Sequence, residues 1–198
     1  MWEVTINETN FELAKKHIMN IILRWWTMIL REANKDDLLS IGKVQVDSNR
    51  STYAGIMLKD YLENLSYESK ASEWNERLFN EKRTQFMYVA ETDDANIIGF
   101  ASASLVRTND LFERELFSIY ILKKFQRSGI GRLLIKAIIT KFIESYIRSM
   151  ILWTLQDNPS RLFYKHLGGK IVGKRIIDRG GKELQQTAYA WEDITCIL

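Results

Sequence analysis

The stretch from 116 to 142 constrains this chain more than any other part of the sequence. An apolar run at 116–122 predicts a buried strand, and a short basic loop follows at 123–128. Gly129 and Gly131 then lead directly into an apolar-periodic helix. The first N–H groups of a helix have no partners within it, glycines allow close approach, and the helix dipole adds partial positive charge. The pattern therefore predicts a binding site for a phosphate or pyrophosphate group.

Two common phosphate-binding motifs do not fit these residues. A P-loop needs Lys and a hydroxyl residue after its last glycine, but Arg132 and Leu133 follow Gly131. A Rossmann fingerprint needs a third glycine or alanine where this chain has Leu134. What fits is Q-x-x-G-x-G, which starts at Gln126. From these six residues alone, a glycine-containing turn before a helix remains the alternative.

The hexapeptide resembles the acetyl-CoA pyrophosphate loop of the GNAT N-acetyltransferases. Further segments along the chain resemble that family: ILREANKDDLLSI, VQVDSNRSTYAGIM, YVAETDDANIIGFASASL, and Asn158 with FYKHLGG. The resemblance covers roughly Met28 to Leu198. It implies an α/β protein with the GNAT acyl-CoA N-acyltransferase fold, in which helices flank a mixed, mostly antiparallel central sheet.

Hydrophobic periodicity and turn signals predict the individual elements. Strands are expected at 28–32, 86–91, 97–106, 116–122, 150–155, 170–177 and 183–191. Helices are expected at 37–46, 56–65, 66–81, from the glycine loop to about 147, and at 159–168. A polar loop is expected at 47–54, between the first two helices.

Residues 1–26 do not match the family, so we divide the chain into an N-terminal helical extension, 1–26, and an acetyltransferase domain, 27–198. A short strand is predicted at 2–6, and a helix from 11 to 26. That helix is apolar and carries two tryptophans. We therefore expect it to cover either its own domain or a second subunit in a homodimer.

Composition narrows the class of protein. The net charge of +3 comes from scattered basic residues, which counts against a nucleic-acid partner. The most apolar early stretch, 18–30, is too short and too polar to span a bilayer, so no membrane partner is expected. A single cysteine, Cys196, points to a reducing compartment, and we expect a cytoplasmic protein. His17 and His166 do not form a convincing metal site, so no metal is expected.

The resemblance also implies which residues bind acetyl-CoA, the expected co-substrate. The strand before the loop would offer backbone groups to the pantetheine arm at Ile119, Tyr120 and Ile121. The loop itself would wrap the pyrophosphate through Gln126, Arg127, Ser128, Gly129, Ile130, Gly131 and Arg132. Asn158 and Tyr164 match later cofactor contacts of the family. The alternative role for Asn158 is a helix N-cap, and the two roles are compatible.

The resemblance implies two catalytic residues. Glu115 opens the central strand, where some family members keep a glutamate that deprotonates the attacking ammonium. The alternative is a solvated charge at the end of a strand. Tyr164 matches the tyrosine that the family places near the CoA sulfur, where a phenol can protonate the departing thiolate. The alternative is an aromatic ring that only packs against the pantetheine.

The acceptor is the open question. Arg50 and Tyr53 are candidates for contacting it, or else they brace their loop. Asn49 stands where related members often carry Trp, which leaves acceptor preference open. Acidic residues in likely substrate-side loops weakly suggest a cationic acceptor: Asp36, Asp37, Asp110 and Glu113.

We therefore expect an N-acetyltransferase that transfers the acetyl group of acetyl-CoA to a primary amine by direct attack. The acceptor would be a small molecule or a peptide amine. The alternative is a non-catalytic acyl-CoA-binding regulatory or sensor protein.

Overall fold

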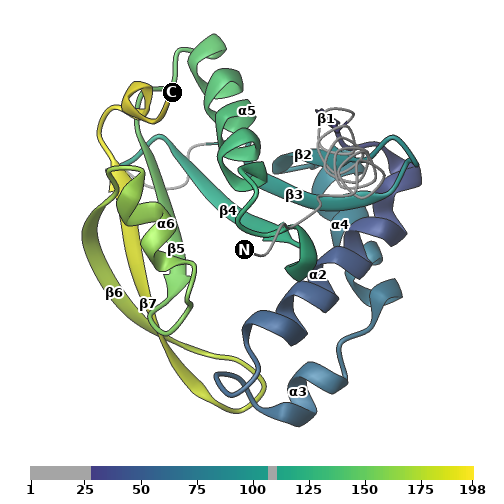
Figure 1. Ribbon diagram of the computed structural model, residues 1–198. Coiled ribbons are helices and arrows are strands. Elements are labelled where there is room, and N and C mark those ends of the chain that lie inside the picture. The colour runs from purple at the N-terminus through teal and green to yellow at the C-terminus, as the bar shows by residue number, and fades with distance from the viewer. Residues whose placement is uncertain (1–27, 107–110) are drawn as a thin grey trace, which may run out of the picture.

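A computed structural model describes residues 28–106 and 111–198, and its centre is one seven-stranded sheet (Figure 1). The strand order is β1-β2-β3-β4-β5-β7-β6. The strands are β1 (Ile29–Glu32), β2 (Gln85–Glu91), β3 (Ile97–Ser104), β4 (Arg114–Ile121), β5 (Met150–Leu155), β6 (Lys170–Asp178) and β7 (Glu183–Trp191). Neighbours are antiparallel except β4 and β5, which are parallel. The predicted mixed, mostly antiparallel sheet is confirmed.

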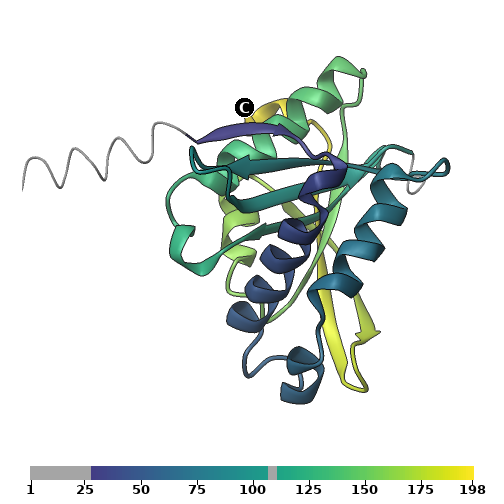
Figure 2. The same ribbon diagram turned by 90° about the vertical axis from the view of Figure 1, so that its right-hand side faces the viewer.

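Helices cover both faces of the sheet (Figures 1 and 2). They are α2 (Leu38–Thr52), α3 (Lys59–Glu63), α4 (Tyr67–Phe79), α5 (Ile130–Glu144) and α6 (Arg161–His166), with 3-10 turns η1 (Lys35–Asp37), η2 (Lys123–Phe125) and η3 (Ile194–Ile197). One hydrophobic cluster joins α2 and α4 to β2 and β3, and another joins α5 and α6 to the opposite face. The predicted strand at 2–6 and helix at 11–26 lie outside the described residues.

The sequence of α5 explains why it sits against the sheet. Its apolar side chains recur at helical spacing and are buried: Ile130, Leu134, Ile135, Ile138, Ile139 and Phe142. Full burial of one such side chain contributes about 1.5–3 kcal/mol. Gly129 adopts φ 89° at the N-cap, a left-handed conformation that favours glycine. Gly168, which follows the end of α6, likewise has φ 82°.

The first two helices differ from the prediction. The expected loop at 47–54 is wrong, because α2 continues to Thr52. Ser48 and Asn49, which have low helix propensity and favour loops, are buried in this helix. Tertiary packing therefore overrides local preference here. The next helix, predicted at 56–65, is the shorter α3.

Arg31 links β1 to the start of α2 through hydrogen bonds. The Arg31 guanidinium donates to both Asp37 carboxylate oxygens at 2.7 and 2.8 Å, and also to Glu91. The Asp37 carboxylate accepts a further bond from the Asn34 N–H at 2.8 Å. Burial alone raises the pKa of Asp37, but the bonds from Arg31 and Asn34 outweigh it, so the pKa is lowered.

We predict that Asp37→Asn lowers the free energy of unfolding by about 2 kcal/mol, because a buried charge-assisted bond is lost. The Asp37 carboxylate stabilises the fold fully above about pH 4, the ordinary pKa of the unfolded chain, and this contribution is lost as the pH falls through the lower folded pKa. Thermal melts of both proteins across pH should converge in acid. The exposed neighbour provides a control, Asp36→Asn, and an equal loss in that variant would contradict the assignment.

Candidate functional site

The candidate site begins where β4 and β5 separate. Their parallel ladder holds only two residue pairs, Arg114 with Met150 and Glu115 with Ile151. On its other edge β5 pairs with β7 along its whole length, from Met150 to Leu155. A bulge in β4 leaves Phe117 unmatched against β3, and bulges bend a strand. The β4 edge that faces β5 is therefore left without a ladder partner over the rest of the described strand.

The predicted cofactor residues on β4 lie along this unpaired edge. Ile119, Tyr120 and Ile121 keep their backbone pairing with β3 on the other side. Backbone N–H and C=O groups in a partly buried strand need partners. An extended ligand that itself carries amide groups can supply them, as an added strand would.

The loop between β4 and α5 holds a row of free N–H donors. Within the described chain, the backbone N–H groups of 127–131 have no hydrogen-bond acceptor. Side chains brace the loop instead: Gln126 Nε2 donates to the Ile121 carbonyl at 3.0 Å, and Ser128 Oγ donates to the Phe125 carbonyl at 2.5 Å. Arg127 adopts φ 63°, next to Gly129 with its left-handed φ. The arrangement is an anion-binding nest at the start of a helix.

Asn158 connects this region to α2. Its Oδ1 accepts from the Ser160 N–H at 2.8 Å, but the N-cap of α6 is Ser160, so Asn158 is not the N-cap of this helix. Its Nδ2 donates to Thr154 Oγ1 at 3.0 Å and to the Tyr53 hydroxyl at 3.3 Å. The fold thus brings together Tyr53, predicted on the acceptor side, and Asn158, predicted on the cofactor side.

Tyr164 has the surroundings of a neutral proton donor. Its side chain is only 8% exposed, and its ring packs against Phe163 and Tyr189 with centroids 5.5 and 6.0 Å apart. Burial, helped by the nearby Tyr120, raises the pKa of Tyr164 above the usual value of a phenol. The phenol therefore holds its proton at neutral pH.

Glu115 is half-buried at the end of the two-pair ladder. Its backbone N–H donates to Ser104 Oγ at 2.9 Å. Burial raises the pKa of the Glu115 carboxyl, and the positive charge of Arg175 on β6 offsets part of this effect. A carboxylate that is partly desolvated in this way is a stronger base than one in water.

Arg50 takes the bracing role that the sequence left open beside substrate contact. Its guanidinium donates to three backbone carbonyls, those of Leu62, Glu63 and Leu65, at 2.9–3.1 Å. It also lies 5.7 Å from the centre of the Tyr67 ring. These bonds tie α2 to the end of α3 and to the connection that follows it.

Sequence reasoning missed residues on the acceptor side of the fold. Gln45 on α2, Tyr61 on α3 and Arg179 in the β6–β7 turn all influence the Tyr120 phenol. Burial has the largest effect and raises the pKa of Tyr120, whereas Gln45 and Arg179 favour its ionised form. No motif marks these residues, because their proximity depends on where the β6–β7 hairpin ends.

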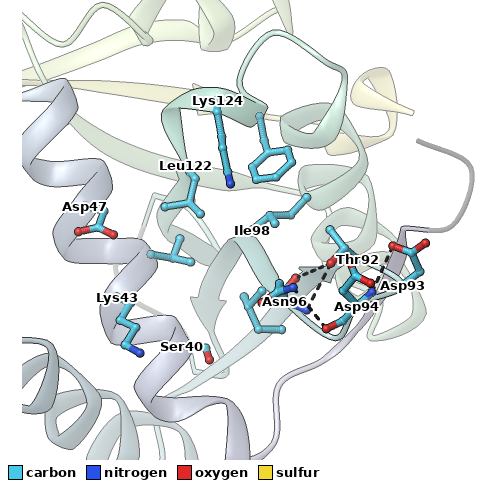
Figure 3. Close-up of a pocket in the computed structure, with 13 residues that line it drawn as sticks. Ser40, Lys43, Asp47, Thr92, Asp93, Asp94, Asn96, Ile98, Leu122 and Lys124 are labelled. Atoms are coloured by element: carbon cyan, nitrogen blue, oxygen red, sulfur yellow. Dashed lines mark hydrogen bonds between the residues drawn. The ribbon is translucent and has the colours of Figure 1, made fainter. Parts of the chain in front are cut away.

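A separate cavity of about 700 Å³ lies on the α2 face of the sheet (Figure 3). It is lined by α2, the β2–β3 turn and η2, with Lys43 and Asp47 on one side and Lys124 on the other (Figure 3). The Lys124 ammonium lies 4.9 Å from the centre of the Phe125 ring. None of the sequence-predicted site residues lines this cavity.

The described residues hold no group of three or more His, Cys, Asp or Glu side chains arranged to bind a metal ion. Within the same residues, no helix is both long enough and apolar enough to cross a membrane.

Comparison with known proteins agrees with this geometry. A model of the acetyltransferase (GNAT) family matches residues 55–168, more than half of the chain. The chain is 31% identical over 169 residues to YuaI of Bacillus subtilis, an uncharacterized N-acetyltransferase, and covers 95% of that protein and 85% of its own length.

Solved structures share the fold. The paiA N-acetyltransferase of Thermoplasma acidophilum, in complex with coenzyme A, superposes with a TM-score of 0.58 at 20% identity, over 81% of this chain and 97% of that one. The Salmonella typhimurium protein yncA, with its cofactor acetyl-CoA, gives 0.62 at 18% identity, over 85% and 94%.

In this mixed sheet β4 and β5 separate, and an anion-binding nest lies beside the separation. This arrangement is typical of a class of enzymes that bind acyl-CoA. This chain belongs to the acetyltransferase (GNAT) family, whose members are acetyl-CoA-dependent N-acetyltransferases.

We predict that inorganic pyrophosphate raises the melting temperature of the wild-type protein and that Gly131→Asp removes this shift. An Asp carboxylate beside the free N–H groups would repel the anion by about 1–4 kcal/mol, which weakens binding at least about fivefold. The matched control is Gly131→Ala, because an added Cβ would be in ordinary contact with Ile121 and Phe163, at 3.4 and 3.5 Å. Binding that is equal in all three proteins, measured by calorimetry, would place the anion elsewhere.

Proposed function

We propose that this protein transfers the acetyl group of acetyl-CoA to a primary amine by direct attack of the amine on the thioester. The observation that carries the proposal is the row of free N–H groups at 127–131, next to the unpaired edge of β4. The N–H groups can hold a pyrophosphate, and the edge of β4 can hold an extended arm that carries amide groups. Acetyl-CoA contains both, joined in that order.

The chain's own residues bind and orient this co-substrate. The nest supports an anion through the N–H groups of Arg127, Ser128, Gly129, Ile130 and Gly131, while the guanidinium groups of Arg127 and Arg132 add positive charge. Ile119, Tyr120 and Ile121 offer backbone groups along the split, and Asn158 and Tyr164 close it from the side of α6. A backbone N–H on this edge can also donate to the carbonyl oxygen as negative charge develops there.

Acetyl-CoA supplies an activated acetyl group, so a C–N bond forms to the amine while the C–S bond breaks. Glu115 accepts a proton from the acceptor's ammonium, directly or through water, and so frees the nitrogen lone pair. Tyr164 donates its phenolic proton to the departing thiolate. The nitrogen loses two protons in all, the thiolate gains one, and one proton is released to solvent.

We predict that Tyr164→Phe lowers kcat about 100-fold, because general acid catalysis is lost. The KM for acetyl-CoA should stay close to the wild-type value, since the ring that packs in the site is retained. Release of free thiol across a panel of amines measures turnover. The matched control is Tyr189→Phe, which removes a hydroxyl from the neighbouring ring. Full activity in Tyr164→Phe would leave this residue as a packing aromatic only.

We predict that Glu115→Gln lowers kcat about 100-fold and removes the acid limb of the pH–rate profile. The wild-type rate should rise as the pH increases through the pKa of Glu115, because only the carboxylate accepts a proton. That pKa lies above the ordinary glutamate value of about 4.3, since burial raises it. The exposed glutamate at the end of α5 gives the control, Glu144→Gln, whose profile should match the wild type. An unchanged acid limb in Glu115→Gln would assign the base to another group.

A further inference from the structure

The middle of α2 is anchored to the β3–β4 side of the sheet. Gln45 Oε1 accepts from Trp74 Nε1 at 2.8 Å. The Trp74 ring packs against Phe100, and Phe100 packs against Tyr120 of β4, with ring centroids 5.4 and 5.3 Å apart. These contacts place Gln45 beside the end of β4.

The C-terminal end of α2 contacts the segment that follows β5. The Tyr53 hydroxyl accepts from Asn158 Nδ2 at 3.3 Å, and the same Nδ2 donates to Thr154 Oγ1 of β5 at 3.0 Å. In Figure 1 the helix runs from the β1 side of the sheet toward the β6–β7 hairpin. Helix α2 therefore passes from β4 to β5, across the place where these two strands separate.

Asn49 lies midway between the two contacts. It is one helical turn from Gln45 and one turn from Tyr53, and residues four apart lie on the same side of a helix. The Tyr53 N–H donates to the Asn49 carbonyl at 2.9 Å, so the helix is regular over this turn. This spacing places Asn49 over the separation of β4 from β5.

The Asn49 side chain is buried with an unpaired oxygen. The residue is only 8% exposed, and its Oδ1 has no hydrogen-bond partner among the described residues. A buried acceptor without a partner destabilises the fold, and asparagine also has low helix propensity. Both effects count against this residue inside a helix. A ligand that donates an N–H would supply the missing bond.

The acids that weakly suggested a cationic acceptor have partners within the fold or lie outside its described part. Asp37 is paired with Arg31 beside β1. The Glu113 carboxylate accepts from two backbone N–H groups that precede β5, at 2.7 and 3.0 Å. Asp110 lies outside the described residues. Neither Asp37 nor Glu113 is therefore left to select a cationic acceptor.

The chemistry of acetylation identifies which N–H suits Asn49. A primary ammonium has three protons on nitrogen: one is removed before attack, one leaves after attack, and one stays in the amide product. A carboxamide oxygen accepts a hydrogen bond but does not take the proton. It can therefore serve only the proton that stays on the nitrogen throughout the reaction.

We propose that Asn49 Oδ1 binds the acceptor N–H that is retained in the product, and that this contact restricts the enzyme to primary amines. The inference rests on the proposed acetyltransferase function. A secondary ammonium has only two protons on nitrogen and loses both when it is acetylated. It therefore has no N–H that can stay on Asn49, and it reacts without this contact.

The test pairs primary amines with their N-methyl derivatives: phenethylamine with N-methylphenethylamine, and glycinamide with sarcosinamide. We expect kcat/KM of the wild type to be at least about tenfold higher for the primary amine, the value of one hydrogen bond to a buried oxygen. Asn49→Leu should lower kcat/KM for the primary amine about tenfold and change that for the N-methyl amine little. A ratio that is the same in the wild type and in Asn49→Leu would overturn the proposal.

The melting temperature of the free protein separates a binding role from a structural one. We expect Asn49→Leu to raise it by about 2–4 °C, because an unpaired buried oxygen is removed. The matched control is Ser48→Ala. Ser48 is the neighbouring residue, is 2% exposed, and has an Oγ without a partner. This control should also raise the melting temperature but leave the preference for primary amines intact. A lower melting temperature in Asn49→Leu would show that the carboxamide supports the fold, and would overturn the proposal.

Binding of acetyl-CoA keeps the two levels of inference apart. Its affinity, measured by calorimetry, should be equal in the wild type and in Asn49→Leu. A weaker affinity in the variant would assign Oδ1 to the co-substrate and overturn this inference. Failure of the wild type to bind acetyl-CoA would overturn the proposed function itself. Binding of acetyl-CoA together with equal use of primary and N-methyl amines would overturn only the role of Asn49.

Discussion

The separation of β4 from β5 after two residue pairs is the constraint on which the rest of the site depends. A continuous parallel ladder would use every backbone group on the facing edges. Here the β4 bulge bends one strand, and β7 pairs with the other edge of β5. Backbone donors and acceptors are consequently left over in the middle of a sheet, beside the equally free N–H groups at the start of α5.

Contacts between distant segments hold the two halves of the sheet on either side of this separation. The Asn158 side chain bonds Tyr53 at the end of α2, across 105 residues of sequence. Lys182 in the hairpin bonds the Ile56 carbonyl, across 126 residues. Phe163 of α6 approaches Gly131 at the start of α5, where a larger residue would have less room. These polar and packing contacts therefore stabilise the separation of β4 from β5.

The two sides of the site use different chemistry. The side assigned to acetyl-CoA relies largely on backbone groups, so the side chains there can serve the core, as Ile121 and Ile130 do. The side assigned to the acceptor relies on side chains, among them Tyr53 and Tyr120, whose pKa values burial raises. Backbone recognition tolerates sequence change, whereas side-chain recognition varies with each substitution. Family membership therefore defines the co-substrate class but not the acceptor.

The sequence by itself determined the local elements of this protein, because periodicity and turn chemistry act over a few residues. The strand, glycine loop and helix of 116–142, the β2–β3 and β6–β7 hairpins and the Ser66 cap of α4 were all predictable in this way. Only the tertiary structure decided the extension of α2 through Asn49, the three carbonyls bound by Arg50 and the meeting of Tyr53 with Asn158. It also decided that the β6–β7 turn at Gly180 lies against the Tyr61 ring. Each of these depends on burial or on the end point of a distant element, and no local pattern in the sequence encodes that information.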